Sequence, residues 1–175
     1  SRKMAAYAMV LCNDLADPLE VTLWNSVKAT DINPQTLFDR SKRIHEVPFT
    51  SENKYMLTIN IIDGSEVALL KGAPEIVLKF CATESNDREK VLAELEDWAG
   101  SGLKLLALAY KQKGNLRELK DYAWIGLIGI EDPIRPTVKD AIDLCRKAGI
   151  KVKIVTGDHR GTAEKIATTL GLPIG

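Results

Sequence analysis

The chain has 175 residues, of which 45% are hydrophobic and 27% charged, so it can build one well-packed core or one domain with part of a second. Lysine plus arginine and aspartate plus glutamate both number 24, and this zero formal charge excludes a general attraction to nucleic acid or to an anionic membrane surface. No apolar run reaches about 18 residues and the N-terminus has no signal-peptide pattern, so we expect no membrane-spanning helix here.

The cysteines and histidines offer no metal or disulfide pattern. Cys12, Cys81 and Cys145 are far apart and odd in number, which predicts reduced core thiols. His45 and His159 have no partner at metal-ligand spacing, so we interpret both as structural or solvent-facing and predict no metal site.

The N-terminal part is predicted to be helical. Residues 3–11 are mostly apolar helix formers, and a second helix is expected to begin after Asp17 as cap, with Pro18 at its first position. Glu20 lies where a capping box places its acidic residue, which by itself explains a glutamate there.

Antiparallel strands are predicted next. A strand over 43–49 is interrupted by polar residues and resumes over 54–62, and Asp63-Gly64 then marks a hairpin whose second strand covers 65–70. Further expected elements are helices over 74–81 and 89–99 and strands over 103–111 and 122–130.

The pattern changes near residue 130. The run over 123–130 is almost continuously apolar, as in a strand covered on both faces. A helix from Pro136 to Gly149, a strand over 150–155 and a helix over 160–170 follow, which predicts a parallel βαβα segment. The fold class is therefore α/β: an antiparallel sheet with flanking helices, followed by part of a doubly wound parallel sheet.

One candidate binding stretch lies between a strand and a helix, and it reads Lys71-Gly72-Ala73-Pro74-Glu75. Pro74 suits a first helical position, and the two small residues before it would let a phosphate-bearing ligand approach the backbone beside Lys71. Taken alone, the stretch is equally compatible with an ordinary turn and a solvated lysine.

Three other side chains are candidates for the same ligand. Phe49 follows Pro48 in a polar stretch, where it can stack on a base or plug a sheet corner, and Lys54 lies five residues further on. Lys104 is the only charged residue between Leu103 and Tyr110, so in a half-buried strand its ammonium would need an anionic partner.

A phosphate corner is predicted where the two expected parallel strands end, because ligands of open parallel sheets bind at that edge. Its residues are Asp132, Arg135, Thr156, Gly157 and Asp158. The sequence has no Gly-x-x-x-x-Gly-Lys-[Ser/Thr] loop, no Gly-x-Gly-x-x-Gly and no Asp-x-Asp pair, so no complete catalytic set is present.

In their order and spacing these motifs resemble the cytosolic part of a P-type cation-transporting ATPase. The motifs are Pro48-Phe49-Thr50-Ser51 with Lys54 and Met56, then Lys71-Gly72-Ala73-Pro74-Glu75, then Asp132-Pro133-Ile134-Arg135, then Thr156-Gly157-Asp158. The resemblance implies a nucleotide-binding domain over 1–125 and part of a phosphorylation domain, of the haloacid-dehalogenase-like type, over 126–175.

The resemblance also implies roles for the candidate residues. Phe49 would stack on adenine, Lys54 and Lys71 would line the pocket, Gly72 and Ala73 would shape its wall, and Glu20 would lie near the adenine edge. Lys104 stands where many relatives place an arginine that reaches the ATP phosphates, so the charge is kept and the bidentate geometry is lost. The five corner residues would receive the γ-phosphate, with Mg²⁺ accompanying the nucleotide in the parent protein.

Two departures from the family pattern limit the expected activity. The phosphorylated aspartate of the Asp-Lys-Thr-Gly-Thr motif and the later Gly-Asp-Gly-x-Asn-Asp motif are both absent. We therefore expect an excised segment from the cytoplasmic face of a pump, which binds ATP at about 0.1 to 10 mM and forms no phosphoenzyme. Its expected partners are ATP and the rest of the pump: the membrane part, the actuator domain and the remaining phosphorylation domain.

Two alternatives stay open. A stand-alone nucleotide-binding regulatory module would use the same fold, and the reading frame on either side of the chain would distinguish it. A haloacid-dehalogenase-type phosphatase fits less well, since its nucleophile motif is missing. The transported ion cannot be read from this segment, although the motif from Asp132 to Pro136 resembles the calcium-type and sodium/potassium-type branches.

Overall fold

The computed structural model describes residues 2–82, 84–100, 103–131, 134–155 and 160–173. Contacts divide the chain into two compact units, the first made of 1–88 and 106–128 and the second of 89–105 and 129–175. Residues 20, 49, 54 and 71–73 of the predicted site all belong to the first unit.

The first unit begins with short helices, of which α2 and α3 start at residues with a capping side chain. They are α1 (Arg2–Leu11), α2 (Pro18–Lys28) and α3 (Pro34–Arg40). The Asp17 side chain accepts a hydrogen bond from Glu20 N at 2.8 Å, which confirms the predicted cap of α2. Asn33 caps α3 in the same way by accepting from Thr36 N at 3.0 Å.

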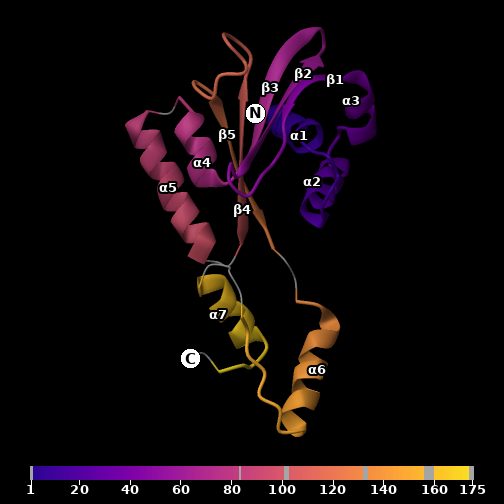
Figure 1. Ribbon diagram of the computed structural model, residues 1–175, viewed down its shortest axis with the longest axis vertical. Coiled ribbons are helices and arrows are strands. Elements are labelled where there is room, and N and C mark those ends of the chain that lie inside the picture. The colour runs from indigo at the N-terminus through magenta and orange to yellow at the C-terminus, as the bar shows by residue number, and fades with distance from the viewer. Residues whose placement is uncertain (1, 83, 101–102, 132–133, 156–159, 174–175) are drawn as a thin grey trace. The chain divides into compact units, whose positions relative to one another are not determined.

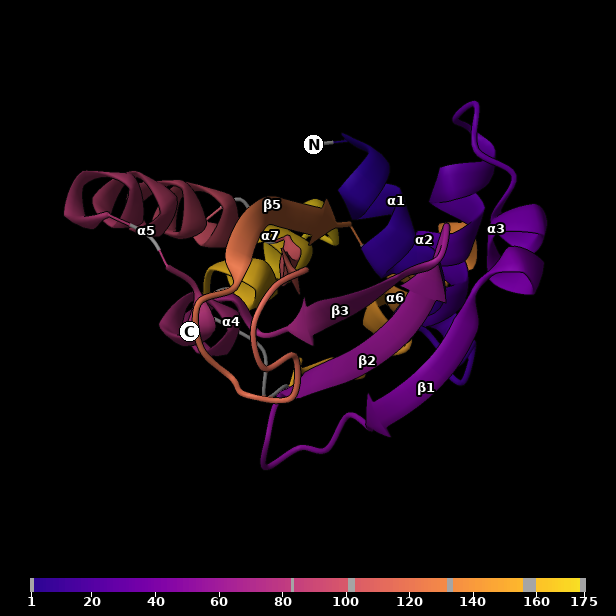
Figure 2. The same ribbon diagram turned by 90° about the horizontal axis from the view of Figure 1, so that it is seen from above.

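A five-stranded sheet follows, in the order β1-β2-β3-β4-β5. Its strands are β1 (Lys42–Val47), β2 (Tyr55–Ile62), β3 (Ser65–Gly72), β4 (Lys104–Lys111) and β5 (Ala123–Ile130). Pairing from β1 to β4 is antiparallel throughout, as predicted, and Figure 2 shows β1, β2 and β3 side by side. Asp63 and Gly64 turn the predicted hairpin with φ angles of 50° and 81°, as a type I′ turn requires.

Each face of the sheet carries its own core. Because side chains alternate along a strand, Met56, Leu69 and Leu108 pack toward α1, α2 and α3, while Leu57 and Leu70 pack on the opposite face with Val77 of α4 (Pro74–Phe80). Figure 1 shows the sheet between these two layers, with α1, α2 and α3 on one side and α4 on the other. Lys71 follows the alternation and points toward α2.

The second unit contains α5 (Ser85–Gly100), most of which belongs to it, together with α6 (Pro136–Lys147) and α7 (Arg160–Thr169). Gly129 lies so close to α5 that a Cβ atom there would be 2.8 Å from Leu103 Cδ1 and 3.2 Å from the Trp98 ring. Among the helices that the structure describes, none combines the length and the apolarity needed to cross a bilayer.

The predicted parallel segment forms only in part. Helices α6 and α7 are present, but residues 151–155 have no regular structure, so the expected strand over 150–155 is absent. A strand needs a hydrogen-bonded neighbour, and β5, its predicted partner, has β4 as its one neighbour in the sheet that the structure describes. Val155 is accordingly 95% exposed, although its run of apolar residues resembles a buried strand.

Candidate functional site

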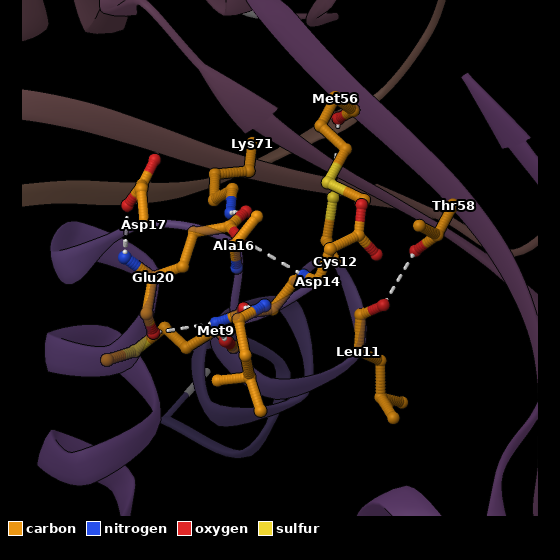
Figure 3. A network of polar contacts seen from close by, with 12 residues as sticks. Met9, Leu11, Cys12, Asp14, Ala16, Asp17, Glu20, Met56, Thr58 and Lys71 are labelled. Atoms are coloured by element: carbon orange, nitrogen blue, oxygen red, sulfur yellow. Dashed lines mark hydrogen bonds and ion pairs between the residues drawn. The ribbon is translucent and has the colours of Figure 1, made fainter. Parts of the chain in front are cut away.

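The first unit contains a buried ion pair at the end of β3. Lys71 Nζ lies 2.7 Å from Glu20 Oε1, and the two residues are only 5% and 8% exposed. Figure 3 shows the Lys71 side chain reaching from the sheet to the first turn of α2. The structure thus brings together two of the predicted site residues, and they come from elements 51 positions apart in sequence.

The second carboxylate oxygen of Glu20 is held by backbone. Glu20 Oε2 accepts hydrogen bonds from Asp14 N at 3.2 Å and from Ala16 N at 3.0 Å (Figure 3). The predicted capping box is therefore wrong in detail, because the carboxylate bonds to the loop before the cap and not to the N–H of Asp17. The short loop between α1 and α2 curls far enough to aim these two N–H groups at one oxygen.

These contacts control the ionisation of Glu20. Burial raises its pKa, but the hydrogen bond and charge of Lys71 and the N–H groups of Ala16 and Asp14 together outweigh burial. The net effect is a pKa below the ordinary value of 4.5, so the carboxylate is charged at neutral pH.

A pH dependence follows from the direction of this shift. A lowered folded-state pKa contributes stability that is complete above the unfolded-state value and is lost as pH falls through the folded-state value. We therefore expect the difference in free energy of unfolding between the wild type and Glu20→Gln to narrow as pH drops from about 7 to about 3. Urea titrations at several pH values measure it. A constant difference would show that the Glu20 charge is not what stabilises the fold.

The end of β3, just after Lys71, is built by close approach of two backbone segments. A Cβ atom on Gly72 would lie 2.5 Å from Lys54 O and 2.7 Å from Tyr55 Cα, so only glycine fits there. Ala73 N donates to Lys54 O at 2.9 Å, and Pro74 then begins α4. The structure thus joins Gly72 and Ala73 to the backbone of Lys54, so that three more predicted site residues lie together.

Phe49 lies in the loop between β1 and β2. The residue is 59% exposed, so the alternative of a core plug at a sheet corner is wrong. The loop is closed by Lys54 N donating to Thr50 O at 2.8 Å, and Lys54 adopts a left-handed φ of 57°. The loop reaches the strand that carries Lys71 through the hydrogen bond from Ala73 N to Lys54 O.

The other predicted residues lie elsewhere. Lys104 begins β4 within the second unit and is exposed, so burial does not oblige its ammonium to find an anionic partner. Arg135 precedes α6 in the same unit and is also exposed. The remaining corner residues, Asp132, Thr156, Gly157 and Asp158, lie outside the described residues.

A separate depression of about 560 Å³ between α2 and α3 contains none of the predicted site residues. Its lining includes Trp24, Lys28 and Asp31. Ligand sites place a few converging polar groups in an apolar setting, and buried charges converge at the end of β3 but not here. We therefore take the end of β3 as the candidate site.

Two residues near the site were missed by the sequence reasoning. Arg43 donates to the Leu11 and Asn13 carbonyl oxygens at 3.0 and 2.7 Å, and Asn13 itself is 2% exposed and bonds Met9 O and Glu20 O at 2.9 Å. An asparagine just after an apolar helix is a signal that could have indicated the second of them, whereas an arginine in an alternating strand carries none.

Comparison with known proteins identifies the family. The model of the P-type ATPase cytoplasmic domain N matches residues 12–137, which include the Glu20–Lys71 pair, the Phe49 loop and all five strands. The chain belongs to this family of P-type ATPase domains. The resemblance carried by the motifs is thereby confirmed, and the antiparallel sheet with its helices is the part of the predicted fold class that the structure bears out.

Relatives of this P-type ATPase domain include proteins named as cation-transporting ATPases from distant organisms. "Calcium-transporting ATPase 1" of Lactococcus lactis is 36% identical over 98% of this chain and 22% of its own length. "Sodium/potassium exporting P-type ATPase cta3" of Schizosaccharomyces pombe is 36% identical over 89% of the chain and 17% of its own length. "Cation-transporting ATPase pma1" of Synechocystis is 32% identical, with 93% and 21% covered. The chain therefore spans about a fifth of the length of the curated relatives it matches.

Proposed function

We propose that this chain is the ATP-binding segment of a P-type cation pump, in which residues 1–125 hold the nucleotide and residues 126–175 begin the phosphorylation domain. The parent pump would couple ATP hydrolysis, with Mg²⁺ bound to the nucleotide, to cation transport through an aspartyl-phosphate. The chain would bind ATP and form no phosphoenzyme, since its sequence lacks the Asp-Lys-Thr-Gly-Thr motif. Its partners would be the membrane, actuator and remaining phosphorylation parts of that pump.

The observation that carries this proposal is the state of the Lys71 ammonium. An ammonium has three N–H donors, and among the described residues only Glu20 accepts from it. A buried cation that still has unpaired N–H donors favours an anionic or strongly polar ligand, because an unpaired buried donor costs free energy. Glu20 holds the ammonium in place until the ligand arrives.

The backbone around Lys71 supports a nucleotide as that ligand. The Phe49 loop ends at Lys54, whose carbonyl accepts from Ala73 N directly after Gly72, the last residue of β3. An exposed aromatic ring and a buried ammonium are thus carried by segments that share one hydrogen bond. A base needs a stacking surface and its phosphates need cations, and this pairing supplies both in a chain with no net charge.

Phe49→Ala tests the proposal. Stacking of a base on an aromatic side chain contributes about 1–3 kcal/mol, so we expect ATP affinity to fall about ten-fold. The measurement is an ATP titration of the whole chain, followed by the ring signals of Phe49 and the side-chain signals of Lys71 in nuclear magnetic resonance.

Phe38→Ala is the matched control, because Phe38 is also exposed, at 45%, and lies on α3. It should leave ATP affinity unchanged. Saturating ATP that moves neither the Phe49 nor the Lys71 signals, or an equal loss of affinity in Phe38→Ala, would overturn the proposed function.

A further inference from the structure

We propose that Arg43 is a positioning residue. It couples the α1–α2 loop, whose backbone N–H groups bind the Glu20 carboxylate and form its cradle, to the strand that leads to Phe49. This inference rests on the proposed function, since the two groups it couples are those assigned to the nucleotide. In the part of the chain that the structure describes, the hydrogen-bond and ion-pair partners of Arg43 are Leu11, Asn13, Asp14 and Glu46. Its role is to hold the segments that position Glu20 and Phe49.

The guanidinium of Arg43 bonds to four acceptors. Its Nη2 donates to the carbonyl oxygen of Leu11, the last residue of α1, and to that of Asn13 in the loop that follows. Its Nη1 donates to Asp14 Oδ1 and, at 2.8 Å, to Glu46 Oε2. One planar cation therefore joins the α1–α2 loop to strand β1, and a cation at a helix C-terminus also stabilises the helix dipole.

The loop that Arg43 holds is the cradle of Glu20. Asp14 N and Ala16 N donate to Glu20 Oε2, and Leu15 between them adopts a left-handed φ of 56°, a backbone conformation that is strained for leucine. Asn13 Oδ1 accepts from Leu15 N at 2.8 Å on the inner side of the same turn. Arg43 thus holds the conformation of the loop whose N–H groups bind the Glu20 carboxylate. That carboxylate in turn holds the Lys71 ammonium.

A β-bulge in β1 places Arg43 and Val47 on opposite faces of the sheet. The register between β1 and β2 shifts between Arg43 and His45. Residues four apart in a regular strand share a face, yet Arg43 contacts the end of α1 whereas Val47 packs in the core on the opposite face. Because of the bulge, Arg43 can bind the α1–α2 loop while Val47, two residues before Phe49, packs in the core on the other face.

Lysine cannot replace this guanidinium, because it offers a point charge in place of a planar fork with five donors. We expect Arg43→Lys to weaken ATP binding about five-fold, the equivalent of one ordinary hydrogen bond. We also expect it to shift the Phe49 ring signals and the Ala16 amide signal before any ATP is added. Asp14→Asn, which keeps the shape and removes one acceptor charge, should give the same changes more weakly and replaces Arg43→Lys if that variant does not fold.

Two controls separate positioning from general stability. Arg40→Lys changes an exposed arginine at the end of α3 and should alter neither affinity nor the Phe49 signals. Val67→Ala removes core volume at the hairpin end of β3, so it should lower stability and leave ATP affinity intact.

Wild-type affinity in Arg43→Lys, unchanged Phe49 and Ala16 signals, or an equal affinity loss in Val67→Ala would overturn the inference. If the wild type itself failed to bind ATP, the proposed function would fail. The signals measured without ATP would then still decide whether Arg43 couples the two segments.

Discussion

Glu20→Gln is expected to lower the free energy of unfolding by about 3 kcal/mol, a large effect for the exchange of one oxygen for an amide nitrogen. Removing one partner leaves the Lys71 ammonium buried beside a neutral amide. The side chains of Lys71 and Glu20 are 6% and 10% exposed, which places the loss near the lower end of the range for buried pairs. The glutamine amide has one oxygen and one NH₂ group, so its oxygen can accept either from Lys71 or from the two backbone N–H groups. Whichever donor is left then meets the NH₂ group, which is itself a donor.

Urea unfolding at neutral pH measures this loss, with Glu66→Gln as control. Glu66 is an exposed residue on the same strand as Lys71, and its substitution should change stability by less than about 0.5 kcal/mol. In the double variant Glu20→Gln/Lys71→Met the buried charge is gone and the amide oxygen can serve Ala16 N. Most of the lost stability should therefore return. Additive losses in the double variant would show that the pair is not coupled.

Gly72→Ala is expected to cost about 2 kcal/mol of stability and to displace the Lys54 backbone. The added methyl group would meet Lys54 O, Tyr55 Cα and Tyr55 Cβ at 2.5, 2.7 and 2.8 Å. Two of these atoms are backbone and the third is attached directly to it, so no side-chain rotation relieves the overlap. The pairing of Tyr55 with Gly72 at the end of the β2–β3 ladder would have to open.

Thermal unfolding gives the stability change, and the amide signal of Ala73 reports whether its hydrogen bond to Lys54 O persists. Gly100→Ala is the matched control, because a Cβ atom there meets nothing within 4 Å at the end of α5. It should be neutral or slightly stabilising. A Gly72→Ala variant as stable as the wild type, with an unchanged Ala73 amide, would show that the strands separate without cost.

The local elements of the first unit could be predicted because their causes are local. Asp17 caps α2 with a hydrogen bond to a residue three positions away, and Asp63-Gly64 sets the hairpin through two backbone angles. Once that turn is fixed, the pairing of Ile62 with Ser65 determines every later pair, including Tyr55 with Gly72. The hairpin signal therefore suffices to place the motif residues around Gly72 at one end of the sheet.

The parallel segment shows the limit of this reasoning. The run over 150–155 has the apolar composition of a buried strand, but composition does not supply a neighbouring strand. In the structure β5 pairs within the antiparallel sheet and residues 151–155 stay without a ladder. The predicted division into domains at residue 125 and the phosphate-corner roles remain predictions.

The amino-acid sequence by itself determined the helix starts, the hairpin and its register, and the family motifs, since each depends on neighbours a few positions apart. Only the tertiary structure decided that Glu20 faces Lys71 and that Arg43 links the end of α1 to Glu46. These side chains meet across 51 and about 30 positions of chain, where packing of α1 and α2 on one face of the sheet sets the geometry. Such contacts depend on a shared core and on a bulge in β1. The sequence spacing of the contacting residues predicts neither of these two features.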